Sequence, residues 1–276
     1  MTPDKRDLSR SHSPAQPRIK SEEEFKMEDL ILHREEELRS LKERLLKRKP
    51  LLLHGRSGIG KTLLIRHIVE SMAEVLYCES STSTQVVFRS VAERLLDSRN
   101  PRVQGGCRDR DGIRAKSAVS LKGIVMDALR EGSYTIVLDH IDQPSQSFAA
   151  AVREIVGWCS TPVVAVARSH HMEDTGFLQP LYSDRHTRYE LKNFDPATAE
   201  KFAEQVVERA GLSGSNIKEF VGKVLELTEG NPGAMVGMLQ MAAYPQYRSG
   251  GHIKIAPLYI DFRMSGSRAA PRRERA

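Results

Sequence analysis

The chain has 276 residues, of which 39% are hydrophobic, and this is enough for one α/β domain and a smaller helical one. Its formal net charge of +6 permits contact with nucleic acid or another acidic surface, although part of the excess lies in arginines near the C-terminus. No apolar run approaches the thickness of a bilayer, and residues 1–20 lack an apolar signal core, so we expect a cytoplasmic protein with no membrane partner.

The first half of the chain predicts strands that alternate with helices. Residues 1–24 are rich in serine, proline and charge, a composition typical of a disordered tail. A charged helix with Leu38, Leu41 and Leu45 on one side follows, and Pro50 then resets the chain for the first strand. Strands are expected at 51–53, 75–77, 134–138, 162–167 and 188–191, with helices between them at 63–69, 86–96 and 121–129. This order predicts an α/β fold with a doubly wound, parallel, five-stranded sheet.

The pattern changes to helices alone at Asp195, which is expected to cap a helix that begins at Pro196. Further helices are expected after Ser215 and from Pro232, and together they predict a small C-terminal helical lid. We therefore expect four parts, namely a tail at 1–24, an α/β domain at 25–193, a lid at 194–245, and an extended segment with a basic tail at 246–276.

Two segments carry signals that argue against regular helices. Residues 98–117 contain Asn-Pro, Gly-Gly and many charges, which predict a loop. Residues 253–262 are apolar but are interrupted by Pro257, which predicts an extended segment.

Residues 55–62 contain a complete phosphate-binding loop of the form G-x-x-x-x-G-K-[ST]. The glycines let consecutive N–H groups turn inward on phosphates, and the helix that follows points its positive end at the same place. Lys61 puts a point charge beside the β- and γ-phosphates, and the Thr62 hydroxyl can ligate Mg²⁺. An ordinary glycine-rich turn is the alternative. The residues predicted to bind a nucleoside triphosphate are Gly55, Arg56, Ser57, Gly58, Ile59, Gly60, Lys61 and Thr62.

A second acidic position lies at the end of the apolar strand that leads to Asp139. In a parallel sheet the carboxyl ends of the strands meet at the edge where ligands bind. Downstream of a phosphate-binding loop, such an aspartate is expected to hold Mg²⁺, usually through a water molecule. A solvated aspartate at the strand end is the alternative.

From about residue 32 to 241, the order of these motifs resembles the AAA+/STAND group of P-loop ATPases, including the origin-recognition type. The segment 33–38, His-Arg-Glu-Glu-Glu-Leu, resembles the box near which the adenine usually lies, with His33 in place of the family's glycine. The strand 163–169 resembles one that ends in a γ-phosphate sensor, and Arg168 falls on the sensor position. The sequence Gly230-Asn231-Pro232 resembles the lid motif whose proline approaches the base.

The resemblance implies ATP with Mg²⁺ as ligands, Arg168 as a sensor and Pro232 beside the base. The alternatives are an ordinary surface arginine after a strand for Arg168 and a common helix start for Pro232. Most members of the group have a glutamate after the strand aspartate, whereas this chain has His140. A histidine can accept a proton near neutral pH, but it is not a direct replacement for a carboxylate, so we expect slow hydrolysis. Arg185 or Arg188 is a candidate to reach the ATP of a neighbouring subunit, with an ordinary solvated charge as the alternative.

Three functions fit these motifs. The first is an ATP-dependent switch or remodeller that works with a protein partner or by self-association. The second is a DNA-associated helper ATPase, which the basic charge permits. The third is a small-molecule kinase, which uses the same loop but which the helical lid fits less well.

Overall fold

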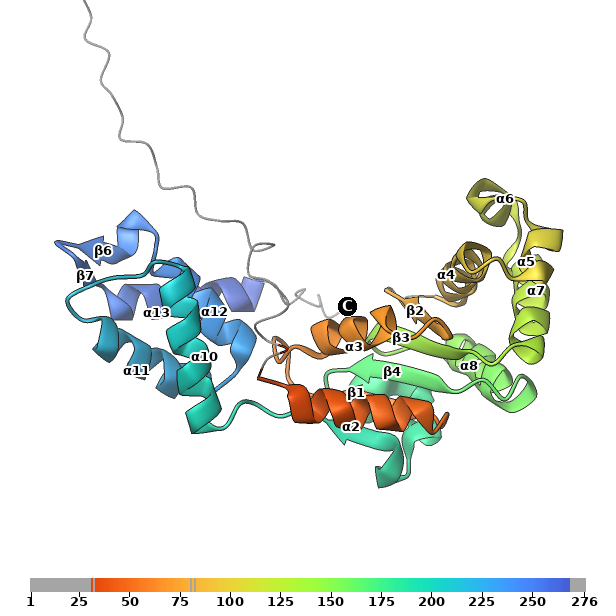
Figure 1. Ribbon diagram of the computed structural model, residues 1–276, viewed down its shortest axis with the longest axis horizontal. Helices are drawn as coiled ribbons and strands as arrows, with labels where there is room; N and C mark the ends of the chain where they lie inside the picture. The colour runs from red at the N-terminus through yellow and green to blue at the C-terminus, as the bar shows by residue number, and fades with distance from the viewer. Residues whose placement is uncertain (1–30, 32, 80, 82, 269–276) are drawn as a thin grey trace, which may run out of the picture.

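Five short strands form one parallel sheet in the computed structural model, which describes residues 31, 33–79, 81 and 83–268. Figure 1 shows the sheet with helices on either side. The strand order is β2-β3-β4-β1-β5, and every neighbouring pair is parallel. Their bounds are β1 (Leu51–His54), β2 (Val75–Cys78), β3 (Thr135–Ile141), β4 (Val163–Ala167) and β5 (Arg188–Glu190). The predicted doubly wound, five-stranded parallel sheet is confirmed.

Helices cover both faces of this sheet, and each face has its own buried core. On one face, α2 (Glu35–Leu46) and α3 (Lys61–Glu70) pack against alternate strand residues, including Val137. On the other face, α4 (Thr84–Asp97), α7 (Ala118–Glu131) and α8 (Gln146–Trp158) pack against Ile136 and Leu138. Because side chains alternate along a strand, Asp139 emerges on the α3 face with Val137. The strand therefore directs this carboxylate toward the helix that follows the phosphate-binding loop.

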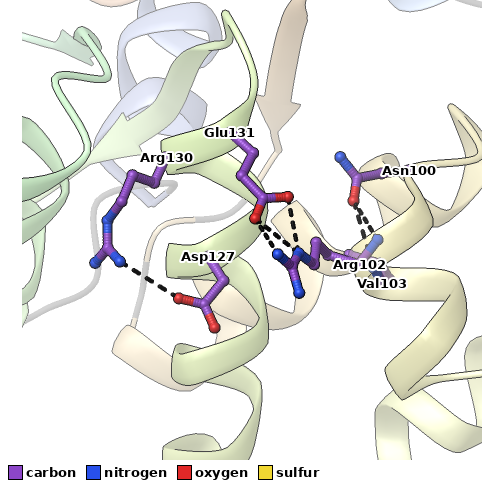
Figure 2. Close-up of polar contacts among 6 residues, drawn as sticks. All are labelled: Asn100, Arg102, Val103, Asp127, Arg130 and Glu131. Carbon is purple, nitrogen blue, oxygen red and sulfur yellow. Dashed lines mark hydrogen bonds and ion pairs between the residues drawn. The ribbon is translucent and has the colours of Figure 1, made fainter.

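The prediction of a loop over residues 98–117 is wrong, because two short helices, α5 (Pro101–Gly106) and α6 (Arg110–Ala115), lie there. Asn100 caps α5 by accepting hydrogen bonds from the backbone N–H groups of Arg102 and Val103. Arg102 also pairs with Glu131 of α7, as Figure 2 shows. The Asn-Pro pair that signals a turn is here an N-cap followed by proline at the first helical position.

Residues 195–241 contain helices and no strand, as predicted, and Figure 1 shows these helices gathered beside the sheet. They are α10 (Pro196–Arg209), α11 (Ile217–Thr228) and α12 (Pro232–Met241). The Asp195 side chain accepts hydrogen bonds from the backbone N–H groups of Ala197 and Thr198, so the predicted cap is confirmed.

The prediction of an extended segment over residues 253–262 is also wrong. A short hairpin of β6 (Arg248–Ser249) and β7 (His252–Ile253) leads into the helix α13 (Ile255–Arg268). Pro257 lies in the first turn of α13, where its missing N–H has no helical partner to lose. Ile253 and Leu258 are buried in the same core as α10, α11 and α12, so this segment packs with the lid helices.

The remaining short elements connect these parts. They are α9 (Met172–Thr175) and the 3₁₀ helices η2 (Gly176–Tyr182), η3 (Arg185–Thr187) and η4 (Pro245–Tyr247). Within the part of the chain that the structure describes, no helix combines the length and apolar character needed to cross a membrane. The predicted tail at 1–24 lies outside the described residues.

Candidate functional site

The loop between β1 and α3 has the backbone that a phosphate cradle requires. Gly60 is the N-cap of α3 with φ of 98°, a left-handed conformation, and no side chain caps the helix. Gly55 approaches the chain after β5 so closely that a Cβ there would lie 2.4 Å from the Leu191 carbonyl oxygen. The first N–H groups of α3 thus have no side-chain cap, and the loop before them requires glycine at positions 55 and 60.

One cavity of about 560 Å³ brings most of the predicted site residues together. Its lining includes parts of the loop, the start of α3, the end of β3 and the end of β4. Gly55, Arg56, Ile59 and Pro232 are not among its lining residues, and Ile59 is instead buried in the core beneath the loop. The predicted residues that do line it are Ser57, Gly58, Gly60, Lys61, Thr62, Asp139, His140 and Arg168.

Lys61 curls back over the loop. Its ammonium group donates hydrogen bonds to the carbonyl oxygens of Gly55, at 2.6 Å, and Arg56, at 2.9 Å. Burial lowers the pKa of Lys61 from its ordinary 10.5 to about 8, with Arg168 acting in the same direction and Asp139 opposing it. Because the charged form is disfavoured here, an anion beside Lys61 would relieve a real electrostatic cost.

Asp139 is almost completely buried, with 1% of its surface exposed, and each of its carboxylate oxygens has a fixed donor. The Tyr77 hydroxyl donates to Oδ2 at 2.7 Å, and the His140 backbone N–H donates to Oδ1 at 2.7 Å. Tyr77 comes from β2, whose register places it beside Val137, two residues before Asp139. Sequence reasoning missed Tyr77, because its only signal is the strand register.

His140 lies at a break in the pairing of β3 with β4, and its backbone takes a φ of 55°. This irregularity turns its side chain outward, so that 64% of the side chain is exposed. Its Nε2 lies 3.8 Å from Asp139 Oδ2. His140 therefore reaches the cavity from its rim, with solvent on one side.

Arg168 follows β4 and lies beside the loop. Its carbonyl oxygen accepts a hydrogen bond from the Gly55 N–H at 3.2 Å, and its guanidinium lies 3.4 Å from Asp142. Its side chain is 60% exposed, so the guanidinium can move without disturbing the core.

The lid contacts the phosphate-binding loop directly. The Asn231 side-chain amide donates to the Ser57 carbonyl oxygen at 3.0 Å, and the Gly233 N–H donates to the Gly58 carbonyl oxygen at 2.9 Å. The sequence motif drew attention to Pro232, but its two neighbours make these contacts.

A second cavity of about 520 Å³ lies where the segment before β1 meets the start of the lid, and its lining includes His33, Arg34, Asn193 and Phe194. Arg34 is 2% exposed and stacks its guanidinium over the Phe194 ring at 4.2 Å. The Nε of Arg34 and the Oδ1 of Asn193 are buried without a hydrogen-bond partner among the described residues. Both atoms are shielded from solvent, so the wall of the cavity contains a donor and an acceptor that the described residues do not satisfy.

Solved structures share this architecture. A Walker-type ATPase of Pyrococcus abyssi is similar with a TM-score of 0.53 and 17% identity, covering 87% of this chain and 76% of that one. The Orc1 protein of Aeropyrum pernix, solved in complex with DNA, is similar with a TM-score of 0.59 and 18% identity. The match covers 88% of this chain and 70% of Orc1. The chain has the fold of an AAA+-like P-loop ATPase.

The resemblance expected from the sequence is thus confirmed at the level of the fold. A STAND protein of Pyrococcus horikoshii with a tetratricopeptide repeat sensor has a TM-score of 0.49 and 14% identity, and the match covers 84% of this chain and 32% of that protein. No protein-family profile and no curated protein matches the chain in sequence.

The residues present fit a magnesium-bound polyphosphate. The cradle excludes a Cβ at Gly55, and the N–H groups at the start of α3 have no side-chain cap. The Thr62 hydroxyl and the Asp139 carboxylate, which line the same cavity, are hard oxygen donors of the type that Mg²⁺ prefers. The assignment of individual residues to these roles stays a prediction.

Proposed function

We propose that this chain binds ATP with Mg²⁺ and acts as a nucleotide-dependent switch or remodeller with slow hydrolysis. The observation that carries the proposal is the single cavity lined by Lys61, Thr62, Asp139 and Arg168, beside a loop that the lid also touches. A change at the phosphates would therefore reach the lid through one short segment of backbone.

In this proposal the loop N–H groups and Lys61 bind the β- and γ-phosphates, and Thr62 and Asp139 hold the metal ion. Magnesium, when bound, would neutralise the charge that develops on the phosphate oxygens. Arg168 swings from Asp142 toward the γ-phosphate, which is supported by the long 3.4 Å contact and by its exposure. The charges at the cavity thus provide both binding and a means to sense the third phosphate.

The second cavity is the proposed place of the base. Adenine presents both hydrogen-bond donors and acceptors on its edge, and the polar side chains of His33, Arg34 and Asn193 line this cavity. Asn193 also donates to the Glu229 carbonyl oxygen, and Glu229 pairs with Arg56 of the phosphate-binding loop. These contacts connect the lining of the second cavity to the phosphate-binding loop, along the path that one nucleotide would occupy.

Of the two arginines considered for a neighbouring subunit, Arg185 is the better candidate. Arg188 donates hydrogen bonds to the carbonyl oxygens of Tyr182, at 2.6 Å, and Ser183, at 3.0 Å, within its own chain. Arg185 is exposed in the short helix η3. A finger that acts in trans would need an exposed position of this kind.

The decisive test of this function is turnover of the purified chain with Mg²⁺ and ATP and no added acceptor. We expect slow phosphate release, well below the median enzyme rate of about 10 s⁻¹, together with a change in lid hydrogen exchange.

The same assay separates the alternative functions. A small-molecule kinase would release ADP only with an acceptor. A DNA-associated ATPase, suggested by the net charge of +6 and the Orc1 likeness, would show DNA binding that weakens steeply with salt. Absence of ATP binding would overturn the proposal.

Replacing His140 by glutamate is expected to raise turnover by about tenfold or more, because a carboxylate would stand where the rim histidine now lies. Steady-state phosphate release measures this directly. His140→Gln is the matched control, since it keeps a polar side chain without a strong base and should not accelerate the reaction. An equal rate for wild type and His140→Glu would contradict the explanation of slow hydrolysis.

A further inference from the structure

A line of polar side chains runs from the surface to Asp139 along the α3 face of the sheet. Arg66 Nε donates to the Tyr77 hydroxyl at 3.1 Å, and that hydroxyl donates to Asp139 Oδ2 at 2.7 Å. The outer end of the line is an ion pair between Arg66 and Glu79. Three elements, α3, β2 and β3, are thus joined through one phenol oxygen.

The placement of Arg66 ties this line to the phosphate-binding helix. Arg66 lies four residues after Thr62 on α3, so the two side chains share one face of the helix. Tyr77 and Asp139 come from neighbouring strands and face the same helix. The proposed metal ligands are Thr62 on α3 and Asp139 on β3. One helical turn further along α3, Arg66 contacts Tyr77, which in turn bonds Asp139.

The Tyr77 hydroxyl differs from that of a tyrosine that only packs in the core. Tyr182, which is also buried, donates its hydroxyl to the Val163 backbone carbonyl at 3.2 Å. Tyr77 instead donates to a buried carboxylate while it accepts from a guanidinium. The Tyr77 hydroxyl thus joins a charged residue of α3 to the carboxylate at the end of β3.

We propose that Tyr77, held by Arg66, is a positioning residue that fixes the Asp139 carboxylate for magnesium. With the His140 N–H on Oδ1 and Tyr77 on Oδ2, the carboxylate cannot rotate without breaking a buried hydrogen bond. The proposal rests on the ATP and Mg²⁺ site described above. Outer hydrogen bonds of this kind set the orientation of metal ligands, and their loss commonly costs 10- to 100-fold in metal affinity.

The test is Tyr77→Phe, with ATP affinity measured by calorimetry in Mg²⁺ and again in EDTA. We expect affinity in EDTA to be unchanged and the gain in affinity that Mg²⁺ provides to fall by about tenfold or more. Arg66→Met should shift the same gain in the same direction by a smaller factor, because it removes the partner of Tyr77 and not the donor itself. An Asp139→Asn background should abolish the effect of Tyr77→Phe.

Tyr182→Phe is the matched control, since it removes a buried tyrosine hydroxyl from the same domain away from the cavity. It should leave the magnesium-dependent gain intact, even where thermal unfolding shows a comparable loss of stability. If Tyr77→Phe keeps the full magnesium-dependent gain in ATP affinity, the positioning role is overturned and the ATP site is not affected. If the wild type binds no ATP, crystal structures of both proteins decide, because an unchanged Asp139 orientation in Tyr77→Phe overturns the inference and a rotated one supports it.

Discussion

Lys61→Ala is expected to lower ATP affinity by at least about a hundredfold, which in a standard titration is loss of binding. In the proposed site the Lys61 ammonium group bonds the phosphates, and charge-assisted hydrogen bonds contribute about 1.5–3 kcal/mol each. Two such bonds to phosphate oxygens account for a hundredfold change or more. Calorimetry or fluorescence titration with ATP measures the effect, and circular dichroism checks that the protein remains folded.

The matched control for this experiment is Lys42→Ala, which removes an exposed lysine from α2. It should bind ATP as the wild type does. Lys61→Arg is expected to restore little, because a planar guanidinium does not fit the space of a compact ammonium that bonds the Gly55 and Arg56 carbonyls. Tight binding by Lys61→Ala would show that the loop does not hold the phosphates.

Gly233→Ala is expected to separate the lid from the phosphate-binding loop. A Cβ at this position would lie 2.7 Å from the Gly58 carbonyl oxygen and 2.9 Å from its Cα, so backbone must move. The movement would break the bond from the Gly233 N–H and strain the one from Asn231 to Ser57. Two hydrogen bonds are worth about 1–3 kcal/mol, so hydrogen exchange at 56–60 and 231–236 should accelerate by about tenfold or more.

Gly222→Ala in α11 is the matched control, because a Cβ placed there would meet no described atom within 4 Å apart from its chain neighbours and the adjacent backbone of its own helix. Alanine in place of glycine within an exposed helix usually stabilises by up to about 1 kcal/mol. The same substitution should therefore have opposite effects at the two sites. In Gly233→Ala, bound ATP should no longer change lid exchange. Unchanged exchange in both segments would contradict the proposed coupling between loop and lid.

The elements that the sequence predicted well are those with an uninterrupted local signal. The loop at 55–62 depends on residue types at fixed spacing, and the strand that ends at Asp139 is continuously apolar. The capping of α10 by Asp195 is similarly local. Such features are determined by neighbours in the chain, so a single sequence contains the information.

The two wrong predictions had ambiguous local signals. The pair Asn100-Pro101 is compatible with a turn and with the start of a helix. The helical form is favoured because it buries Val103 and Ile113 against α4 and α7. A proline disrupts a helix unless it lies in the first turn. Leu258 is buried against the lid helices, and this packing favours a helix whose first turn contains Pro257. In both cases packing against distant residues chose between two local conformations.

Contiguous residues alone predict the loop at 55–62, the strand and helix that flank it, and the apolar strand that ends at Asp139. Three other features are not predictable in this way: Tyr77 bonds Asp139, Asn231 and Gly233 bond the loop, and the His140 side chain lies at the cavity rim. These contacts join residues up to 175 positions apart, from Gly58 to Gly233, and depend on strand register and on how the lid packs beside the sheet. No pattern in a local window encodes such a distance, so the three-dimensional arrangement had to supply it.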